Sequence, residues 1–489
     1  MSAVDDEPGP ISASSSRALL LTAVADALAD VPHGSRAAVA ISGGPDSTAL
    51  AYLTAEARAD LDLVLVHVRH GLRDDAEDQR VVATHASWLG VGLRVVEVEV
   101  RPDGDGMAAA ARRARYEALR RVATEEACEA LLVGHTAEDQ AETLLLRLTR
   151  GTGVDGLAAM RRRAGDLVRP LLRLRRADVH RFVLLEGLPS VTDPSNADPT
   201  SRRSRVRYEV LPTLARTGPD PVAALCRLAD LAADDVAALE RWAAEASEAA
   251  RWVGPVVAVA DGLLHRVPEA VARRVLRLLV VEVGGGPAPS AAAVARVAAL
   301  ARGGALDLPG QVRASAAAGW TTLAPTRLPG QEPTPLVVGA TTAWEPAGIA
   351  VDWHAPQAAP PSATTGQIAL ELAGAWSPPE VTIAAPLPPG AVAERGRLAL
   401  PAGLGPLWLR HRRAGDRLQL AVGRRRLQDL LVDVGLPRPM RELWPVVVDA
   451  DDRLVWVPGV AADEDVLRAG RRAPAALLAL AERVRAGAQ

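Results

Sequence analysis

The chain has 489 residues, 49% hydrophobic content and a net charge of −3, so it is long enough for about three packed domains. Its 56 basic residues are all arginines, which excludes a lysine Schiff base, a pyridoxal phosphate lysine and a kinase-type lysine. It has no uncharged apolar run of about 18 residues, no signal-peptide pattern at its acidic N-terminus and no CxxC pair between Cys128 and Cys226. We therefore expect a cytoplasmic protein that contacts no membrane.

The first 215 residues alternate predicted strands and helices. The strands are expected at 36–41, 61–68, 93–100 and 130–134, and the helices at 46–56, 75–89, 108–127 and 137–148. This alternation predicts an α/β fold with a doubly wound parallel sheet. Ligands of such sheets bind beyond the carboxyl ends of the strands. The loops at 42–47, 67–73 and 134–142 are therefore expected to converge on one crevice.

The pattern changes after residue 215. Amphipathic helices over 221–252, 268–283 and 290–301 predict a helical middle domain at 216–325. Residues 326–389 include stretches rich in Pro, Gly, Ala and Thr, the composition of a linker-rich connection. Short strands at 407–411 and 444–448 and a helix near 427–434 predict a small α+β domain at 390–489. The first domain accordingly spans residues 1–215.

The loop after the first predicted strand is Ser42-Gly-Gly-Pro-Asp-Ser47. A strand, a glycine turn and a helix start together form a phosphate cradle, because glycine lets the backbone approach an anion and the helix N-terminus faces it. A Walker loop would need Gly-Lys-Ser/Thr, which is absent. Asp46 is expected to hold Mg²⁺, with a helix N-cap role as the alternative. The bland alternative for the whole loop is a chance glycine turn.

Two further strand ends carry polar side chains. His67-Val-Arg-His70-Gly-Leu-Arg73 follows the second strand, and His70 is either a nucleotide or substrate contact or a structural histidine. The segment 134–143 begins a helix on which Asp139 and Glu142 share one face. Acids in a first helical turn often only complement the helix dipole. Opposite a phosphate loop, however, they favour a cationic substrate or a metal, and a deprotonated amine is an adequate nucleophile.

Arginine gathers in two segments of this acidic chain. Residues 143–181 hold ten Arg against three Asp, and residues 410–426 hold seven Arg against one Asp. Clustered basic stretches of this kind fit a local polyanion footprint, and solvated helix faces are the alternative. A further run, Arg202-Arg-Ser-Arg-Val-Arg207, follows Asp193-Pro-Ser-Asn196 and is equally compatible with a charged linker.

In this order the motifs resemble those of the tRNA(Ile)-lysidine synthetases, a family of PP-loop ATP pyrophosphatases. The resemblance covers about 36–215 and resumes at 410–460, and the middle domain matches only in size and helicity. It rests on the motifs already quoted together with Ala111-Arg-Arg-Ala-Arg-Tyr116, Arg150-Gly-Thr-Gly153, Arg169-Pro-Leu, Arg413-Ala-Gly-Asp-Arg417, Gly423-Arg-Arg-Arg-Leu427 and Gly435-Leu-Pro-Arg438. It implies an adenine nucleotide alpha hydrolase-like sheet in the first domain.

The resemblance also implies the reaction. ATP and Mg²⁺ would adenylate the C2 oxygen of the wobble cytidine in tRNA(Ile) with a CAU anticodon, and the side-chain amine of free L-lysine would displace AMP to give lysidine. A homodimer is one option for the assembly. The implied nucleotide-binding residues are Ser42, Gly43, Gly44, Pro45, Asp46, Ser47, His70, Gly134 and His135. The implied catalytic residues are Asp46, Arg112, Arg115 and Asp139, with Asp46 also the metal ligand. Lysine would meet Asp139 and Glu142, and tRNA would meet Arg203, Arg205, Arg207, Arg424, Arg425 and Arg426.

The chain departs from the family pattern at three positions of the first domain, and in the C-terminal domain arginines stand where the family has lysines. Ala108, Glu138 and Ser204 stand where the family usually has Glu, Asp and Asn. The alternatives are a tRNA thiolase on the same loop, which would usually need catalytic cysteines or an iron–sulfur cluster, and another PP-loop adenylating ligase, such as an amide-forming enzyme for a small metabolite. A non-catalytic tRNA-binding protein is the alternative outside enzymes.

Overall fold

The computed structural model describes residues 13–69, 75–100, 106–191, 201–301, 303–317, 319–338, 340–347, 349–354, 397–401, 404–472 and 474–482. The chain divides into two compact units, residues 1–237 and 238–489, which are described separately. In the described ranges, no helix combines the length and apolarity that a membrane crossing requires.

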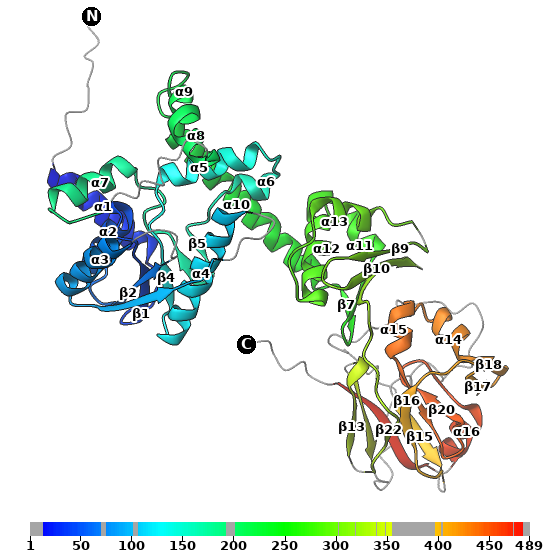
Figure 1. The fold of residues 1–489 in the computed structure, drawn as a ribbon. Coiled ribbons are helices and arrows are strands. Elements are labelled where there is room, and N and C mark those ends of the chain that lie inside the picture. Colours follow the sequence, from blue (N-terminus) through cyan, green and yellow to red (C-terminus); the bar gives the residue numbers. More distant parts are fainter. Residues whose placement is uncertain are drawn as a thin grey trace, which may run out of the picture. The chain divides into compact units, whose positions relative to one another are not determined.

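Unit 1 is built on a mainly parallel sheet (Figure 1). Its strands are β1 (Arg36–Ala40), β2 (Asp62–Arg69), β3 (Gly92–Glu97), β4 (Ala130–Leu132), β5 (Arg163–Ala164) and β6 (Leu167–Val168). The order is β3-β2-β1-β4-β6-β5, with β5 antiparallel at the edge. The chain runs from β1 outward to β2 and β3 and then returns to β4 on the other side of β1. This confirms the predicted doubly wound sheet, and it places the switch point between β1 and β4.

Helices cover both faces of this sheet. One face carries α1 (Ala13–Ala27), α2 (Pro45–Ala57), α3 (Ala76–Leu89) and α7 (Arg176–Leu185), and the other carries α4 (Met107–Glu125). Successive residues of β1 alternate between the two cores: Ala37 and Val39 pack on the first face and Ala38 on the second. Because neighbouring strand residues point to opposite faces, a strand buried on both sides needs the continuous apolar run seen in the sequence.

A helical layer beside the sheet positions several charged residues. It consists of α5 (Ala137–Leu148), α6 (Val154–Leu157), α8 (Arg202–Arg205), the π-helix η2 (Val206–Val210), α9 (Leu211–Ala215) and α10 (Pro221–Ser247). Val206 and Leu211 pack against Ala137 and Ala141 of α5. This apolar contact holds the arginine-rich α8–η2 segment against the acidic face of α5. Helix α10 ends at Ser247, five residues before the predicted end, because strand β7 begins at Arg251.

Unit 2 begins within α10, at Ala238, and continues with an antiparallel sheet in the order β7-β8-β11-β10-β9. Its strands are β7 (Arg251–Val253), β8 (Val256–Ala260), β9 (Ala305–Leu308), β10 (Val312–Ala317) and β11 (Trp320–Pro325), and its helices are α11 (Asp261–Arg266), α12 (Glu269–Gly284) and α13 (Ala291–Ala298). The structure thus adds a sheet to the helices predicted for 216–325. Strand β8 is a short apolar run, which periodicity cannot distinguish from a segment of buried helix.

The rest of unit 2 contains two sheets and a hairpin. The strands of the first sheet are β12 (Thr334–Pro335), β16 (Trp408–His411), β19 (Pro445–Val448), β20 (Leu454–Val457) and β21 (Ala461–Ala462), and those of the second are β13 (Thr341–Trp344), β14 (Ile349–His354), β22 (Pro474–Glu482) and β15 (Arg397–Pro401). The hairpin is β17 (Arg417–Leu420) with β18 (Gly423–Arg426), and the helices are η3 (Glu345–Ala347), α14 (Leu427–Asp433), α15 (Arg438–Leu443) and α16 (Glu464–Arg472).

The segment predicted as a linker therefore contains strands. Three of them, β12, β13 and β14, lie before residue 355, and the remainder up to 396 lies outside the described residues. Strand β14 pairs with β22 near the end of the chain, and Trp344 and Trp353 are buried in the core. A partner so distant in sequence leaves no local pattern that would have predicted these strands.

Candidate active site

The loop 42–47 joins β1 to the N-terminus of α2. The Ser47 hydroxyl donates to the Gly44 carbonyl over 2.9 Å and accepts from the Ser42 amide over 3.0 Å. Gly43 has a φ of +84°, which glycine adopts without strain. Gly44 is the N-cap residue of α2, and no described side chain caps this end. The first-turn amides of α2 are thus left for a ligand, as in anion-binding helix termini.

Gly134 brings the end of β4 against this loop. A Cβ added at Gly134 would lie 2.9 Å from the Asp46 carbonyl oxygen and 3.2 Å from the Ser47 amide nitrogen. Both are backbone atoms, so a larger residue would have to displace the start of α2. Gly134, predicted to contact the nucleotide, thus permits the close packing of two strand ends at the switch point.

Asp46 lies in the first turn of α2, with 28% of its side chain exposed. Its Oδ1 is 3.0 Å from His180 Nε2, and its Oδ2 is 3.8 Å from Arg176 Nε. Gly44, not Asp46, is the N-cap residue, so the alternative N-cap role is not observed. Arg176 and His180 of α7 were missed by the sequence analysis. Their i, i+4 spacing after an arginine-rich stretch was the available signal.

No metal-binding group of three or more His, Cys, Asp or Glu side chains occurs among the described residues. Asp46 offers one carboxylate beside the phosphate loop. This fits Mg²⁺, which usually keeps several waters and is held by one or two carboxylates together with substrate phosphates.

Asp139 and Glu142 form a buried cluster with three arginines. Glu142 is fully buried, with its Oε2 2.7 Å from Arg203 Nε and its Oε1 2.7 Å from Arg207 Nε. Asp139 Oδ1 accepts from Arg176 Nη2 and Arg203 Nη2, each over 2.9 Å. Its Oδ2 accepts from the Thr136 amide over 2.9 Å. We call these five side chains the acid–arginine cluster.

The acid–arginine cluster joins residues that were predicted to have different roles. Asp139 and Glu142 were assigned to lysine, whereas Arg203 and Arg207 were assigned to tRNA. Arg205, between these two arginines, is exposed. Burial opposes ionisation of Asp139, but Arg176 and Arg203 outweigh it and hold the pKa of this carboxyl below its ordinary value. Three guanidinium groups thus face two carboxylates.

Two other polar residues of the 134–143 motif stabilise the fold. Glu138 accepts from Arg175 Nε and from the Arg176 amide, each over 2.8 Å, which fixes the start of α7. The Gln140 side chain donates to the Met160 carbonyl and accepts from the Met160 amide, each over 2.9 Å. These bonds orient α5 and therefore the acid–arginine cluster.

A second basic group surrounds Tyr116 on α4. The guanidinium carbons of Arg112 and Arg115 lie 5.1 and 5.5 Å from the centre of the Tyr116 ring. His135 is buried, and burial together with Arg112 lowers its pKa. In the described part of the chain, no hydrogen-bond partner reaches His135 Nδ1. The predicted contact His70 lies outside the described residues, as does the Asp193–Asn196 motif.

The C-terminal arginines lie on the β17–β18 hairpin. Arg417 pairs with Arg426 and Gln419 with Arg424 across the two strands, so these three arginines share one face. All three are exposed. Arg425 belongs to the other face and forms a 2.7 Å ion pair with Asp433. The hairpin therefore divides the predicted tRNA-contacting residues into Arg425, which is paired, and Arg424 and Arg426, which form no ion pair within the described part of the chain.

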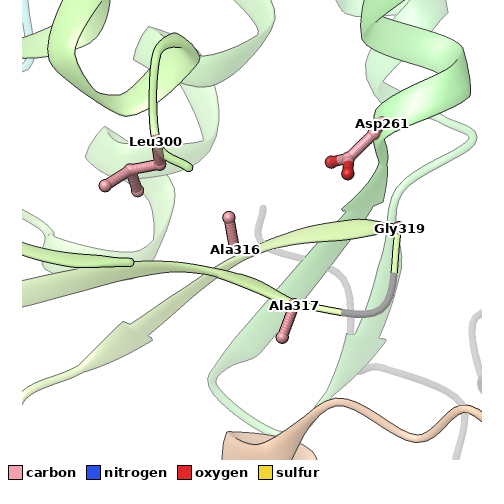
Figure 2. Close-up of a pocket in the computed structure, with 5 residues that line it drawn as sticks. All are labelled: Asp261, Leu300, Ala316, Ala317 and Gly319. Atoms are coloured by element: carbon pink, nitrogen blue, oxygen red, sulfur yellow. The ribbon is translucent and has the colours of Figure 1, made fainter. Parts of the chain in front are cut away.

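A pocket of about 380 Å³ occurs in unit 2 and contains none of the predicted site residues. It is lined by Asp261, Leu300, Ala316, Ala317 and Gly319. Figure 2 shows Asp261 and Leu300 on opposite sides of this space. The Asp261 Oδ1 accepts from the Thr321 hydroxyl over 3.0 Å. The one carboxylate that lines the pocket is already hydrogen-bonded, and the other lining residues carry no polar side chain. These lining residues therefore offer no combination of groups for catalysis.

Comparison with known proteins identifies two family models in the chain. Residues 19–214 match the PP-loop domain, and residues 407–478 match the TilS substrate C-terminal domain. Among solved structures, the U34-tRNA thiolase NcsA from Methanococcus maripaludis covers 45% of this chain and 80% of its own, with a TM-score of 0.40 and 20% identity. That similarity is too low to support an argument about function.

Curated relatives match most of the chain. A tRNA(Ile)-lysidine synthase from Symbiobacterium thermophilum is 36% identical over 468 residues, which cover 88% of this chain and 90% of the relative. That of Chromobacterium violaceum is 35% identical, covering 86% of this chain and 91% of the relative. That of Thermobifida fusca is 45% identical over 55% of this chain and 83% of the relative. With its PP-loop domain, its TilS substrate C-terminal domain and these relatives, the chain belongs to the tRNA(Ile)-lysidine synthase family of tRNA-modifying ligases.

Proposed function

We propose that this enzyme joins free L-lysine to C2 of the wobble cytidine of tRNA(Ile) with a CAU anticodon. In the first step, the cytidine O2 forms a bond to the α-phosphorus of ATP, and pyrophosphate leaves. In the second step, the lysine side-chain amine attacks C2, the C2–O2 bond breaks, AMP leaves with O2, and the amine loses a proton. The main supporting observation is an uncapped helix N-terminus at the switch point, in the same unit as buried carboxylates.

The loop 42–47 is the proposed site of the ATP phosphates. Its backbone amides and hydroxyls can donate to phosphate oxygens, and the α2 N-terminus favours negative charge. Asp46 is the proposed ligand of Mg²⁺, which when bound would neutralise the charge that develops on the leaving pyrophosphate. His180 and Arg176, which contact Asp46 here, would keep its carboxylate oriented toward the loop.

Asp139 and Glu142 are the proposed ligands of the lysine substrate. Both carboxylates are occupied by guanidinium groups, so a lysine ammonium would bind by taking the place of one of them. Such an exchange conserves the charge of the acid–arginine cluster, which avoids leaving a buried carboxylate without a counter-charge. The proposal therefore requires movement of Arg176, Arg203 or Arg207 when lysine binds.

The proposed tRNA contacts of the C-terminal region are Arg424 and Arg426, supported by Arg417 on the same hairpin face. Arginines directly opposite one another repel, and an RNA phosphate between them would remove that repulsion. Arg425 is already paired with Asp433. In unit 1, the exposed Arg205 is the member of the Arg203–Arg207 run that is free to meet RNA without disturbing the acid–arginine cluster. The homodimer, one option for the assembly, remains a prediction.

A tRNA thiolase is the second candidate, and the thiols of this chain argue against it. Burial raises the pKa of Cys226 to about 11 and that of Cys128 above its ordinary value. Both thiols are therefore protonated at neutral pH, whereas sulfur transfer needs a thiolate. Cys226 also contacts the Ala137 carbonyl oxygen at 3.4 Å, as expected of a structural residue.

The test is incubation of the full chain with ATP, Mg²⁺, labelled lysine and a CAU-anticodon tRNA(Ile) transcript, followed by nucleoside analysis. We expect one lysidine per AMP and pyrophosphate released. Asp46→Ala should abolish modification and leave tRNA binding intact, whereas Asp30→Ala, at an exposed position on the surface, should retain both. Failure to consume ATP with lysine and tRNA together, or incorporation of sulfur without lysine, contradicts the proposal.

A further inference from the structure

The carboxyl edge of the unit 1 sheet carries Arg169, which forms no ion pair with the residues that the structure describes. Arg169 follows β6 directly, and β6 is the neighbour of β4, after which His135 lies. Its exposed fraction is 8%, the same as that of His135. Neither the loop 42–47 nor the acid–arginine cluster uses this residue, although it lies at the edge of the sheet where ligands of this fold bind.

The hydrogen bonds of Arg169 leave its charge uncompensated. Its Nη1 donates to the Arg161 carbonyl over 2.6 Å, and its guanidinium also contacts the Tyr116 side chain. Within the described ranges, Arg169 Nε has no hydrogen-bond partner. A nearly buried cation that meets only neutral groups is costly, because buried charges normally have a counter-charge. An anion bound at this position would compensate the charge of Arg169.

Arg112 and Arg115 extend the same positive region toward solvent. Both contact Tyr116, the residue that Arg169 also contacts. Arg115 Nε is a second buried donor without a partner among the described residues. Burial lowers the pKa of Arg169, and repulsion from Arg112 lowers it further. Partial desolvation lowers the pKa of Arg112, repulsion from Arg115 and Arg203 adds to this, and Asp139 acts in the opposite direction. A shared anion would therefore reduce the repulsion among these three guanidinium groups around Tyr116.

We infer that Arg169, Arg112 and Arg115 form a subsite for a phosphate group, and that this phosphate belongs to the RNA backbone beside the reacting cytidine. The inference rests on the proposed function, since it takes the RNA to be the substrate. The loop 42–47 already provides donors for the ATP phosphates, so a second cationic site needs a second phosphate. Arg112 is exposed, which gives a large polyanion access to the subsite from solvent. Arginine suits this role because its planar fork binds phosphate through two parallel hydrogen bonds.

The experiment compares Arg169→Gln with Arg173→Gln. Arg173 is a matched control, because it has the same charge, lies four residues away and is 55% exposed in an ion pair with Asp230. The dissociation constant of a CAU-anticodon tRNA(Ile) transcript is measured between low and moderate salt without ATP or lysine. The dissociation constant of ATP is measured separately without RNA. A melting curve shows whether each variant is folded.

We expect Arg169→Gln to weaken tRNA binding about ten-fold and to reduce the slope of log affinity against log salt by about one. ATP affinity and the Arg173→Gln variant should match the wild type. Loss of ATP affinity with unchanged tRNA affinity would assign the phosphate to the nucleotide and overturn the inference. Unchanged affinity for both ligands in a folded variant would show a structural role only, which also overturns it.

Arg169→Lys covers the case in which Arg169→Gln does not fold. It keeps the charge but loses Nε and the fork, so we expect a smaller loss of tRNA affinity with an unchanged salt slope. Wild-type tRNA affinity in this variant contradicts the subsite. Because binding is measured without the reaction, a wild-type enzyme that binds tRNA but forms no lysidine would contradict the proposed function and leave this result standing.

Discussion

Arg203 Nε lies 2.7 Å from Oε2 of Glu142, a side chain with no exposed surface. The same arginine reaches Asp139 through Nη2 at 2.9 Å. One guanidinium thus bridges two carboxylates on successive turns of α5. Because the bridge is buried on its acidic side, the contact between α8 and α5 depends on charge as well as on the apolar packing of Val206 and Leu211.

Arg203→Gln should destabilise unit 1. Glu142 would lose a charge-assisted hydrogen bond while staying buried, which costs roughly 1–3 kcal/mol. Hydrogen–deuterium exchange of the α5 peptide reports this change locally and should become faster. Arg205→Gln is the control, because Arg205 is exposed two residues away and its loss should change stability by less than about 0.5 kcal/mol. Equal exchange in the two variants would contradict the bridge.

Gly134→Ala should impair catalysis and stability together. The new Cβ would overlap the Asp46 backbone at 2.9 Å, so α2 and the loop 42–47 would have to shift. Overpacking of this kind costs about 1–3 kcal/mol, and a displaced phosphate loop should lower the modification rate at least ten-fold. Gly153→Ala is the matched control, since no atom lies within 4 Å of its added Cβ and its φ is −85°. A Gly134→Ala enzyme with normal rate would contradict the close approach.

Stability should fall as the pH drops below about 6.5, in part because of His85. Burial lowers the pKa of His85 from 6.5, while its Nε2 is 2.9 Å from the Pro189 carbonyl and its Nδ1 is 3.2 Å from the Tyr52 hydroxyl. Below pH 6.5 the imidazole of His85 is protonated more readily in the unfolded chain than in the folded chain. The free energy of unfolding therefore falls by at most about 1.4 kcal/mol per pH unit. His85→Gln should show a shallower decline between pH 7 and 5 in urea unfolding. If the free energy of unfolding fell equally with pH in the wild type and in His85→Gln, the contribution of His85 would be contradicted.

The β17–β18 hairpin should bind RNA through one face only. Arg424→Gln or Arg426→Gln should each weaken binding of a tRNA(Ile) transcript and lower its salt slope by about one. Arg425→Gln should leave the slope unchanged, because that guanidinium already pairs with Asp433. Filter binding at several salt concentrations measures all three. If Arg425→Gln lowered the salt dependence of tRNA affinity as much as the other two variants, RNA would contact both faces of the hairpin.

Much of unit 1 was predictable because its signals are local. The strands β1 and β2 are apolar runs bounded by turn residues, and the glycines of the loop 42–47 need no distant partner to form a turn. The doubly wound parallel sheet followed from the alternation of strands and helices, whereas the order of its strands came only from the structure. Asp139 and Glu142 were identified as neighbours by their spacing on one helix.

The partners of those side chains were not predictable in the same way. Arg176 and Arg203 approach Asp139 only because α7 and α8 pack near α5, and no periodicity encodes that meeting. In the sheet of β7 to β11, strand β8 was missed because a short apolar strand and a buried helix segment look alike in a single sequence. Strand β14 was assigned to a linker because its partner β22 lies near the far end of the chain.

The sequence by itself determined which chemical groups this protein has and the order in which they occur along the chain. These groups are a phosphate loop without lysine, two acids one turn apart and clustered arginines. Only the tertiary structure decided how these groups are paired. It joined the acids to Arg203 and Arg207, left Arg169 without a counter-charge among the described residues and separated Arg425 from its neighbours. The physical reason is that turns and periodic faces depend on nearby residues, whereas the pairing of buried charges depends on which helices pack together.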